Sequence, residues 1–293
     1  MRSVSMLVFS GTGNTLFAAE EIAARLSALG CEADIAALEG FCRQNARRAW
    51  PEADLVGIGY PVHAFNAPPL VERIISQMPV SATHRDCFLL RTAGSPWGNG
   101  GPTERVRALL HAKKLHVRYE ALVPLPSTFA VRYPDVFIKL NLLHALRQCE
   151  AIARDLASGK RRLSHSSLPL QLLAALFRAE HTGARFYGRL LRADSSCTAC
   201  GLCASDCPTG NISMHQGKPR FGWNCTFCMR CSHRCPVQAI SHRLTGRKLM
   251  IRDRFDLRRI LADDSIEPMD INASAPPYLK DFRDFYRREG LLG

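Results

Sequence analysis

Hydrophobic and polar positions in the first 125 residues alternate between two patterns. Continuous apolar runs predict buried strands, and segments with an apolar side chain every three or four residues predict the helices between them. The strands are expected at Val4–Phe9, Cys31–Leu38, Asp54–Tyr60, Asp86–Thr92 and Val117–Leu125, and the helices at Leu16–Leu29, Pro68–Met78 and Glu104–Lys114. Strands that alternate with helices indicate a parallel sheet covered by helices on both faces.

The pattern changes after residue 125. Residues 126–193 predict two helices, Asp135–Leu156 and Leu168–Leu191, which would connect two domains. Residues 194–240 are rich in Cys, Gly and Pro, and residues 241–293 form a charged tail with little periodicity. We therefore expect a sheet domain (1–125), a helical connector (126–193), a cysteine-rich domain (194–240) and a C-terminal tail (241–293).

Charge and hydropathy narrow the classes of function. The formal net charge of +13 is concentrated in residues 126–193, which hold 11 basic and 4 acidic side chains. No stacking platform of aromatic residues and no nucleic-acid motif accompanies these charges, so nucleic-acid binding is not expected. The apolar stretch Leu168–Phe177 is shorter than the ~18 residues of a spanning helix. We expect a cytoplasmic protein without a transmembrane segment.

Eight of the 12 cysteines lie in an internal repeat. Cys197-x2-Cys200-x2-Cys203-x3-Cys207-Pro recurs, 28 residues later, as Cys225-x2-Cys228-x2-Cys231-x3-Cys235-Pro. Structural zinc sites normally use pairs of ligands separated by a longer loop. Three Cys at spacing two and a fourth before Pro favour cubane iron–sulfur clusters. The other cysteines, Cys31, Cys42, Cys87 and Cys149, are expected to be ordinary thiols.

These motifs resemble those of bacterial-type two-cluster ferredoxins. In that family the fourth Cys of each motif binds the cluster of the other motif. The resemblance implies one 4Fe-4S cluster on Cys197, Cys200, Cys203 and Cys235, and a second on Cys225, Cys228, Cys231 and Cys207.

The first predicted strand ends in a loop rich in glycine and hydroxyl groups: Ser10, Gly11, Thr12, Gly13, Asn14 and Thr15. A loop between a strand and a helix directs backbone N–H groups at an anion. The loop lacks the Lys of a Walker motif, and Leu16 stands where the dinucleotide fingerprint has its third Gly. Its hydroxyl and amide donors suit a single terminal phosphate.

The first 125 residues resemble the flavodoxins, which bind the phosphate of FMN in such a loop. The resemblance implies an α/β fold with a doubly wound parallel five-stranded sheet of order 2-1-3-4-5, followed here by the helical connector and a small α+β ferredoxin-like domain. It also implies that the loops after the third and fourth strands hold the flavin ring. These residues are Tyr60, Pro61, Val62, His63, Ala64, Phe65, Asn66, Ala93, Gly94, Ser95, Trp97, Gly98 and Gly100.

The joined architecture resembles the iron–sulfur flavoprotein family, in which a flavodoxin-like domain is fused to a two-cluster ferredoxin domain. The resemblance implies a protein that passes electrons between two 4Fe-4S clusters and FMN, and so couples one-electron and two-electron carriers. Its partner would be a redox protein such as a ferredoxin or a reductase. The alternative is an FMN-dependent reductase of a small organic substrate, for which His63 is the nearest candidate proton donor.

Overall fold

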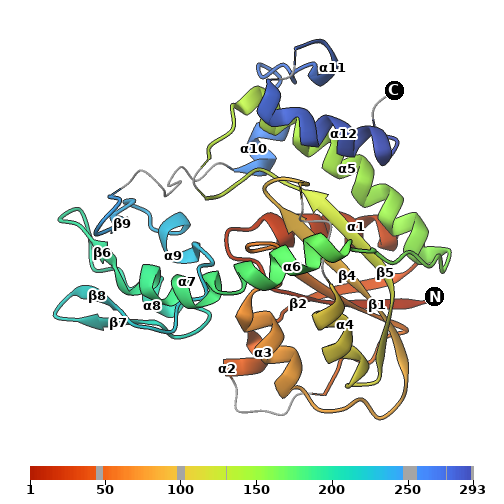
Figure 1. Ribbon diagram of the computed structural model, residues 1–293, viewed down its shortest axis with the longest axis horizontal. Coiled ribbons are helices and arrows are strands. Elements are labelled where there is room, and N and C mark those ends of the chain that lie inside the picture. Colours follow the sequence, from red (N-terminus) through yellow and green to blue (C-terminus); the bar gives the residue numbers. More distant parts are fainter. Residues whose placement is uncertain (44–48, 98–102, 130, 247–255, 275, 292–293) are drawn as a thin grey trace.

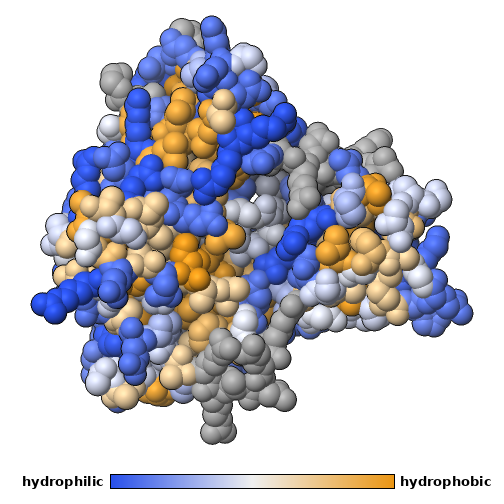
Figure 2. Space-filling model, turned by 180° about the vertical axis from the view of Figure 1, so that it is seen from behind, coloured by the Kyte–Doolittle hydropathy of each residue, from blue (hydrophilic) through white to orange (hydrophobic). Residues whose placement is uncertain are grey.

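The computed structural model describes residues 1–43, 49–97, 103–129, 131–246, 256–274 and 276–291. Figure 1 shows a larger α/β body and a smaller lobe beside it that carries strands β6 to β9. The same two parts are seen from the opposite side in Figure 2, where the lobe projects from one flank of the body. We call residues 191–246 the lobe.

The body is built on one parallel sheet with the strand order β2-β1-β3-β4-β5, which confirms the flavodoxin-like topology. The strands are β1 (Ser3–Val8), β2 (Glu32–Ala37), β3 (Leu55–Pro61), β4 (Arg85–Ala93) and β5 (Leu115–Pro124). Strands β1, β3 and β4 are buried along most of their length, which explains their continuous apolar sequences. The strand order reverses between β1 and β3, where the carboxyl ends of open α/β sheets bind ligands.

Helices cover both faces of the sheet. Helices α1 (Asn14–Ala28) and α5 (Asp135–Ala157) pack in one core cluster, and α3 (Pro69–Gln77) and α4 (Glu104–His111) pack in the other. The short α2 (Gly40–Arg43) follows β2. The predicted connector therefore contains two different parts, because its first helix, α5, lies within the core of the body.

The C-terminal tail also packs on the body. It forms α10 (Leu257–Ala262), α11 (Ile271–Ser274), a 3-10 turn (Pro277–Leu279) and α12 (Lys280–Arg288). Side chains from α12, including Phe282, Phe285 and Tyr286, are buried in the same core cluster as α1 and α5. The tail thus completes the body after the chain has left the lobe.

Helices α6 (Leu168–Phe177) and α7 (Glu180–Arg189) lead from the body to the lobe (Figure 1). The sequence predicted one helix here, but it breaks at a turn over residues 178–179. Helix α6 is fixed to the body, because Asn66 donates a hydrogen bond to the carbonyl of Ala174 and Arg178 forms an ion pair with Glu72, both at 2.8 Å. None of the described helices is long and apolar enough to cross a membrane.

The lobe repeats one small unit. Strands β6 (Leu191–Ala193) and β9 (Ile240–His242) pair antiparallel, as do β7 (Ile212–His215) and β8 (Lys218–Phe221). The helical turns α8 (Leu202–Ser205) and α9 (Arg230–His233) occupy matching positions of the two cysteine motifs. The repeated residues Ile212 and Ile240 are both buried in the core of the lobe.

Candidate functional site

The loop after β1 is shaped by Gly13 and Ser10. Gly13 has φ 106°, a left-handed conformation that glycine adopts without strain, and it stands directly before α1. The Ser10 hydroxyl accepts hydrogen bonds from the backbone N–H groups of Gly13 and Leu16, at 3.2 and 3.3 Å. The N-cap residue Gly13 has no side chain, so the N–H groups of Asn14 and Thr15 at the positive end of α1 are open to a bound anion.

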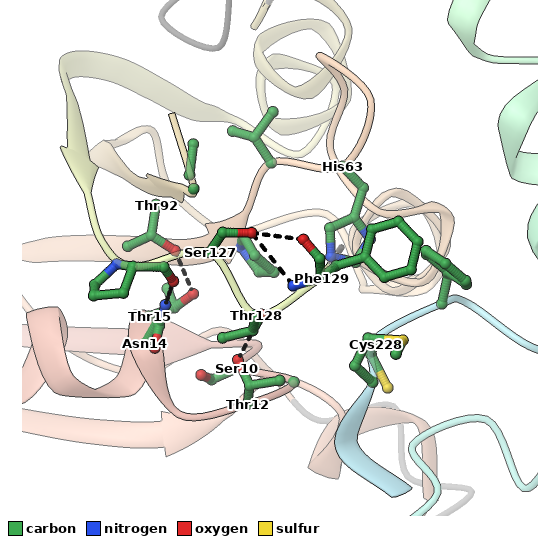
Figure 3. A pocket seen from close by; sticks show the side chains of 18 of the residues that line it. Ser10, Thr12, Asn14, Thr15, His63, Thr92, Ser127, Thr128, Phe129 and Cys228 are labelled. Carbon is green, nitrogen blue, oxygen red and sulfur yellow. Dashed lines mark hydrogen bonds between the residues drawn. The ribbon is translucent and has the colours of Figure 1, made fainter. Parts of the chain in front are cut away.

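Other hydroxyl groups of this loop are held from the neighbouring strands (Figure 3). The hydroxyls of Thr15 and Thr92 are 2.8 Å apart, and Thr12 donates to Thr128 at 3.3 Å. The Asn14 amide donates to the carbonyl of Pro126 at 2.8 Å. These bonds fix the loop against the ends of β4 and β5.

A cavity of about 210 Å³ opens beside this loop. Its described lining comes from the ends of β1, β3, β4 and β5, and from Phe227, Cys228 and Met229 of the lobe. Figure 3 shows that its two ends differ: Ser10, Thr12, Asn14, Thr15 and Thr92 lie toward one end, and His63, Phe129 and Cys228 lie toward the other. The cavity is therefore shared by the body and the lobe.

The structure brings together most of the residues that the sequence proposed for FMN. Those that line the cavity are Ser10, Gly11, Thr12, Asn14, Thr15, Pro61, Val62, His63, Ala64, Ala93 and Gly94. The described residues outside the lining are Gly13, Tyr60, Phe65, Asn66, Ser95 and Trp97. Gly98 and Gly100 fall outside the described part of the chain.

The aromatic residues proposed as ring contacts have other surroundings. Tyr60 is buried in the core under α3 and α4, and its burial raises the pKa of the phenol. Phe65 packs edge to face against Trp97 at 5.6 Å and against Phe177 of α6 at 5.2 Å. Phe177 of α6 thus packs on Phe65, while Trp97 stays more than half exposed.

Sequence reasoning did not propose the segment after β5 or the residues from the lobe. Pro126, Ser127, Thr128 and Phe129 line the cavity because β5 ends at the same edge of the sheet as β1, β3 and β4. The position of that strand end was a usable signal, since all five strands are parallel. Nothing in the sequence indicated that Phe227 would meet this edge.

Two small cavities in the lobe gather the eight motif cysteines. Cys197, Cys200, Cys203 and Cys235 line one of them, and Cys207, Cys225, Cys228 and Cys231 line the other. Each cavity takes three cysteines from one motif and the fourth from the other. This is the crossed grouping that the resemblance to two-cluster ferredoxins implies.

Electrostatic coupling among the thiols agrees with this grouping. Burial, with smaller effects of nearby Cys197, Cys200 and Cys235, raises the pKa of Cys203 to about 11. Burial likewise raises the pKa of Cys228 to about 12. Because bare thiolates are disfavoured in these cavities, iron would supply the charge that keeps all four ligands ionised.

The second cysteine cavity lies directly against the loop after β1. A Cβ atom placed on Gly11 would meet the carbonyl oxygen of Cys228 at 2.1 Å. Only glycine allows the two backbones to approach this closely. On the other side, a Cβ on Gly188 of α7 would meet the Cβ of Cys225 at 2.0 Å. The body and α7 therefore enclose this end of the lobe.

Polar contacts hold the lobe in this position. Arg230 of α9 donates hydrogen bonds to the carbonyl of Ser10 and to the carboxylate of Glu39, each at 2.6 Å. A ring nitrogen of His233 lies 3.1 Å from the carbonyl of Thr128. Phe129 packs edge to face on Phe227 at 4.7 Å. The contacts reach both the first and the last strand end of the cavity.

Comparisons with known proteins assign the lobe. Residues 196–240 match the family model described as a 4Fe-4S dicluster domain. Its eight cysteines, in two groups of four, fit two 4Fe-4S clusters. No curated protein matches the chain.

Solved structures resemble the body at low identity. A flavodoxin from Streptococcus pneumonia TIGR4 is 14% identical, with a TM-score of 0.37, and the match covers 54% of this chain and 99% of that one. The Megasphaera elsdenii flavodoxin is 21% identical, with a TM-score of 0.35 and coverage of 52% and 98%. The apo form of an NADH:FMN oxidoreductase is 17% identical, with a TM-score of 0.37 and coverage of 52% and 90%. The strand order of the sheet, not these low overall similarities, defines the fold as flavodoxin-like.

A flavodoxin-like body joined to a 4Fe-4S dicluster domain defines a protein of the redox class.

Proposed function

We propose that the protein is an electron-transfer iron–sulfur flavoprotein, with FMN in the cavity of the body and two 4Fe-4S clusters in the lobe. Clusters accept single electrons and FMN accepts one or two, so together they would couple one-electron to two-electron carriers. One observation carries the proposal: Cys228, a proposed cluster ligand, lines the same cavity as the loop from Ser10 to Thr15.

The loop end of the cavity suits the phosphate of FMN. Gly13 leaves the first backbone N–H groups of α1 free, and the side chains of Thr12 and Asn14 line the same end of the cavity. The lining of the cavity that the structure describes contains neither Lys nor Arg. Backbone and hydroxyl groups would therefore bind the phosphate without a cationic side chain.

The opposite end suits the flavin ring. Val62, Ala64, Phe129, Phe227 and Met229 give it apolar walls, as flat cofactors require. A ring bound there would lie close to Cys228 and thus to the group held by Cys207, Cys225, Cys228 and Cys231. We call this the proximal cluster site, and the site of Cys197, Cys200, Cys203 and Cys235 the distal one.

Composition is the first test. Protein purified without oxygen should contain about eight iron atoms, about eight sulfides and one FMN per chain. Eight irons without flavin would contradict the FMN assignment and leave the dicluster domain. Reproducible zinc in place of iron would contradict the clusters.

A charge placed in the loop tests where the phosphate binds. Thr12→Glu puts a carboxylate among the phosphate donors and should lower FMN affinity at least about 100-fold, with the iron content unchanged. Leu16→Glu is the matched control, because Leu16 is exposed on α1 and does not line the cavity. Equal FMN affinity in the two variants would place the phosphate elsewhere.

A second candidate function is reduction of a small substrate over the flavin. It is favoured by His63, which lines the ring end of the cavity and is held by paired backbone hydrogen bonds of 2.9 Å between His63 and Asn66. His63→Asn should lower turnover with small quinones at least tenfold, and leave the transfer of electrons from cluster to flavin unchanged. Unchanged quinone turnover would remove this function.

A further inference from the structure

The two cysteine sites of the lobe differ in how far they are enclosed. The proximal site is closed by the body at Gly11 and by α7 at Gly188. In the distal site Cys200 is exposed, and Cys197, Cys203 and Cys235 are partly exposed. An external electron carrier therefore comes closer to the distal site than to the proximal one.

Apolar side chains surround the distal site at the surface. Leu202, Met214 and Val237 all line the distal cavity, and they are 38%, 37% and 39% exposed. Large apolar side chains so close to an exposed ligand provide a contact area that excludes water.

The lobe as a whole carries an excess of positive charge. The described lobe carries six basic residues, Arg192, Lys218, Arg220, Arg230, Arg234 and Arg243, against two acidic ones, Asp194 and Asp206. No ion pair joins Lys218 or Arg220 to an acidic side chain in the part of the chain that the structure describes, and both are exposed.

The hairpin of β7 and β8 carries the two cations close to the distal site. At its turn, Gly217 lies beside Ala199, which stands between the ligands Cys197 and Cys200, with 3.8 Å between a Cβ on Gly217 and that of Ala199. Lys218 follows Gly217 directly. Pro219 lines the distal cavity, and its neighbours Lys218 and Arg220 are exposed on the outer face of the same strand.

From these observations we infer that the distal face of the lobe, formed by Leu202, Met214, Val237, Lys218 and Arg220, docks an acidic one-electron carrier protein. The inference rests on the proposed function and names its partner class. Each encounter moves one electron: the iron centre of the carrier is oxidised, the lobe is reduced, and no bond forms or breaks. Opposite charges would speed the encounter, and the apolar centre would hold the complex.

Binding of a strongly acidic, oxidised [2Fe-2S] ferredoxin to the holoprotein tests the inference without any electron transfer. Lys218→Glu/Arg220→Glu should raise the Kd at least about tenfold at low ionic strength, and the difference should shrink as salt is added. The control, Lys160→Glu/Arg161→Glu, makes the same charge change in the exposed link after α5, on the far side of the body from the lobe (Figure 1). It should leave the Kd within about twofold.

Several outcomes would overturn the inference. If both double variants raised the Kd for ferredoxin equally, the net charge of the protein alone would attract the ferredoxin. If Lys218→Glu/Arg220→Glu abolished binding to phosphatidylglycerol vesicles but left the Kd for ferredoxin unchanged, the face would be a membrane contact. Iron and FMN contents, and reduction by dithionite, are measured on the same samples, so failure of the proposed function is seen separately.

Discussion

At the scale of the residue, two glycines allow the body and α7 to approach the proximal cluster site closely. Gly11 and Gly188 lie on opposite sides of it, one in the body and one in α7, and each leaves less space than a methyl group needs. Both contacts involve backbone or Cβ atoms of cysteines, which cannot move without displacing a proposed cluster ligand. These glycines are therefore part of the cluster environment although neither binds iron.

Replacing Gly188 should prevent binding of the cluster at the proximal site. In Gly188→Ala the new Cβ would overlap Cys225, and the iron content should fall from about eight to about four per chain, because only the proximal site is disturbed. Gly183→Ala in the same helix is the control, since apart from its chain neighbours and the nearby backbone of the helix no atom lies within 4 Å of the added Cβ. The control should keep its iron and gain up to about 1 kcal/mol of stability. Full iron content in Gly188→Ala would show that the added methyl group does not disturb the proximal site.

His144 of α5 is a buried histidine outside the site. It is 5% exposed, it stacks on Tyr286 at 4.2 Å, and its ring nitrogens have no hydrogen-bond partner among the described residues. Burial, with a smaller effect of Arg147, lowers its pKa from 6.5 to about 4. The unfolded chain thus binds one proton more than the folded chain between these values, and stability falls as the pH drops through this range.

Removing His144 should flatten part of the pH dependence of stability. His144→Phe keeps a ring against Tyr286 but cannot take up a proton. Between pH 7 and pH 5, the free energy of unfolding should fall by about 2 kcal/mol more in the natural protein than in the variant. Denaturant titrations at the two pH values measure this difference, and an identical pH dependence in the two proteins would show that folding does not lower the pKa of His144.

At the scale of the element, the helices of the tail show where hydrophobic patterning fails. The five strands of the first 125 residues and helices α1, α3 and α4 were predicted, because apolar runs of this length leave few alternatives, whereas the short α2 was not predicted. In α12 the buried residues Phe282, Phe285 and Tyr286 recur at helical spacing, but the helix is only nine residues long and its other positions are charged, so the segment resembles a polar tail. Helix α5 was recognised as a helix, but its sequence could not show which core receives it.

The tail should stabilise the body as strongly as a core helix does. Phe282 is buried and packs edge to face on Phe137 of α5 at 4.9 Å, so Phe282→Ala should lower the free energy of unfolding by about 3–5 kcal/mol. Phe186→Ala is the control for an exposed aromatic, for which about 1 kcal/mol or less is expected. Similar losses in both variants, measured by denaturant unfolding, would argue against a structural role for the tail.

At the scale of the whole molecule, the site depends on contacts that local sequence does not encode. The cysteine motifs specify the clusters and the glycine loop specifies an anion site, so the two chemistries could be predicted separately. The contact between the two sites could not be predicted, because the hydrogen bond between Arg230 and Ser10 joins residues 220 positions apart. The same holds for Phe227 and Cys228, which reach the cavity only once the lobe has docked.

Arg230 should hold the two halves of the site together. The side chain of Arg230 is 14% exposed and pairs with the largely buried side chain of Glu39, so Arg230→Leu leaves that charge unpaired at a cost of about 3–5 kcal/mol. The rate of electron transfer from cluster to flavin should fall at least tenfold after flash reduction. Arg234→Leu is the control, because its ion pair with Asp206 is half exposed and should contribute at most about 1 kcal/mol. Equal rates in the two variants would show that the lobe needs no such anchor.

The pairing of β6 with β9 has a consequence for how such a protein could be rebuilt. The chain enters and leaves the lobe through two strands that lie side by side, Leu191 opposite His242, and it then returns to the body in α10. The lobe is therefore an insertion, joined at a single two-stranded stem, rather than an appendage at one end. Another small redox module whose ends are equally close could be grafted onto this stem without cutting the body in two, which makes the body a ready host for chimeric electron carriers.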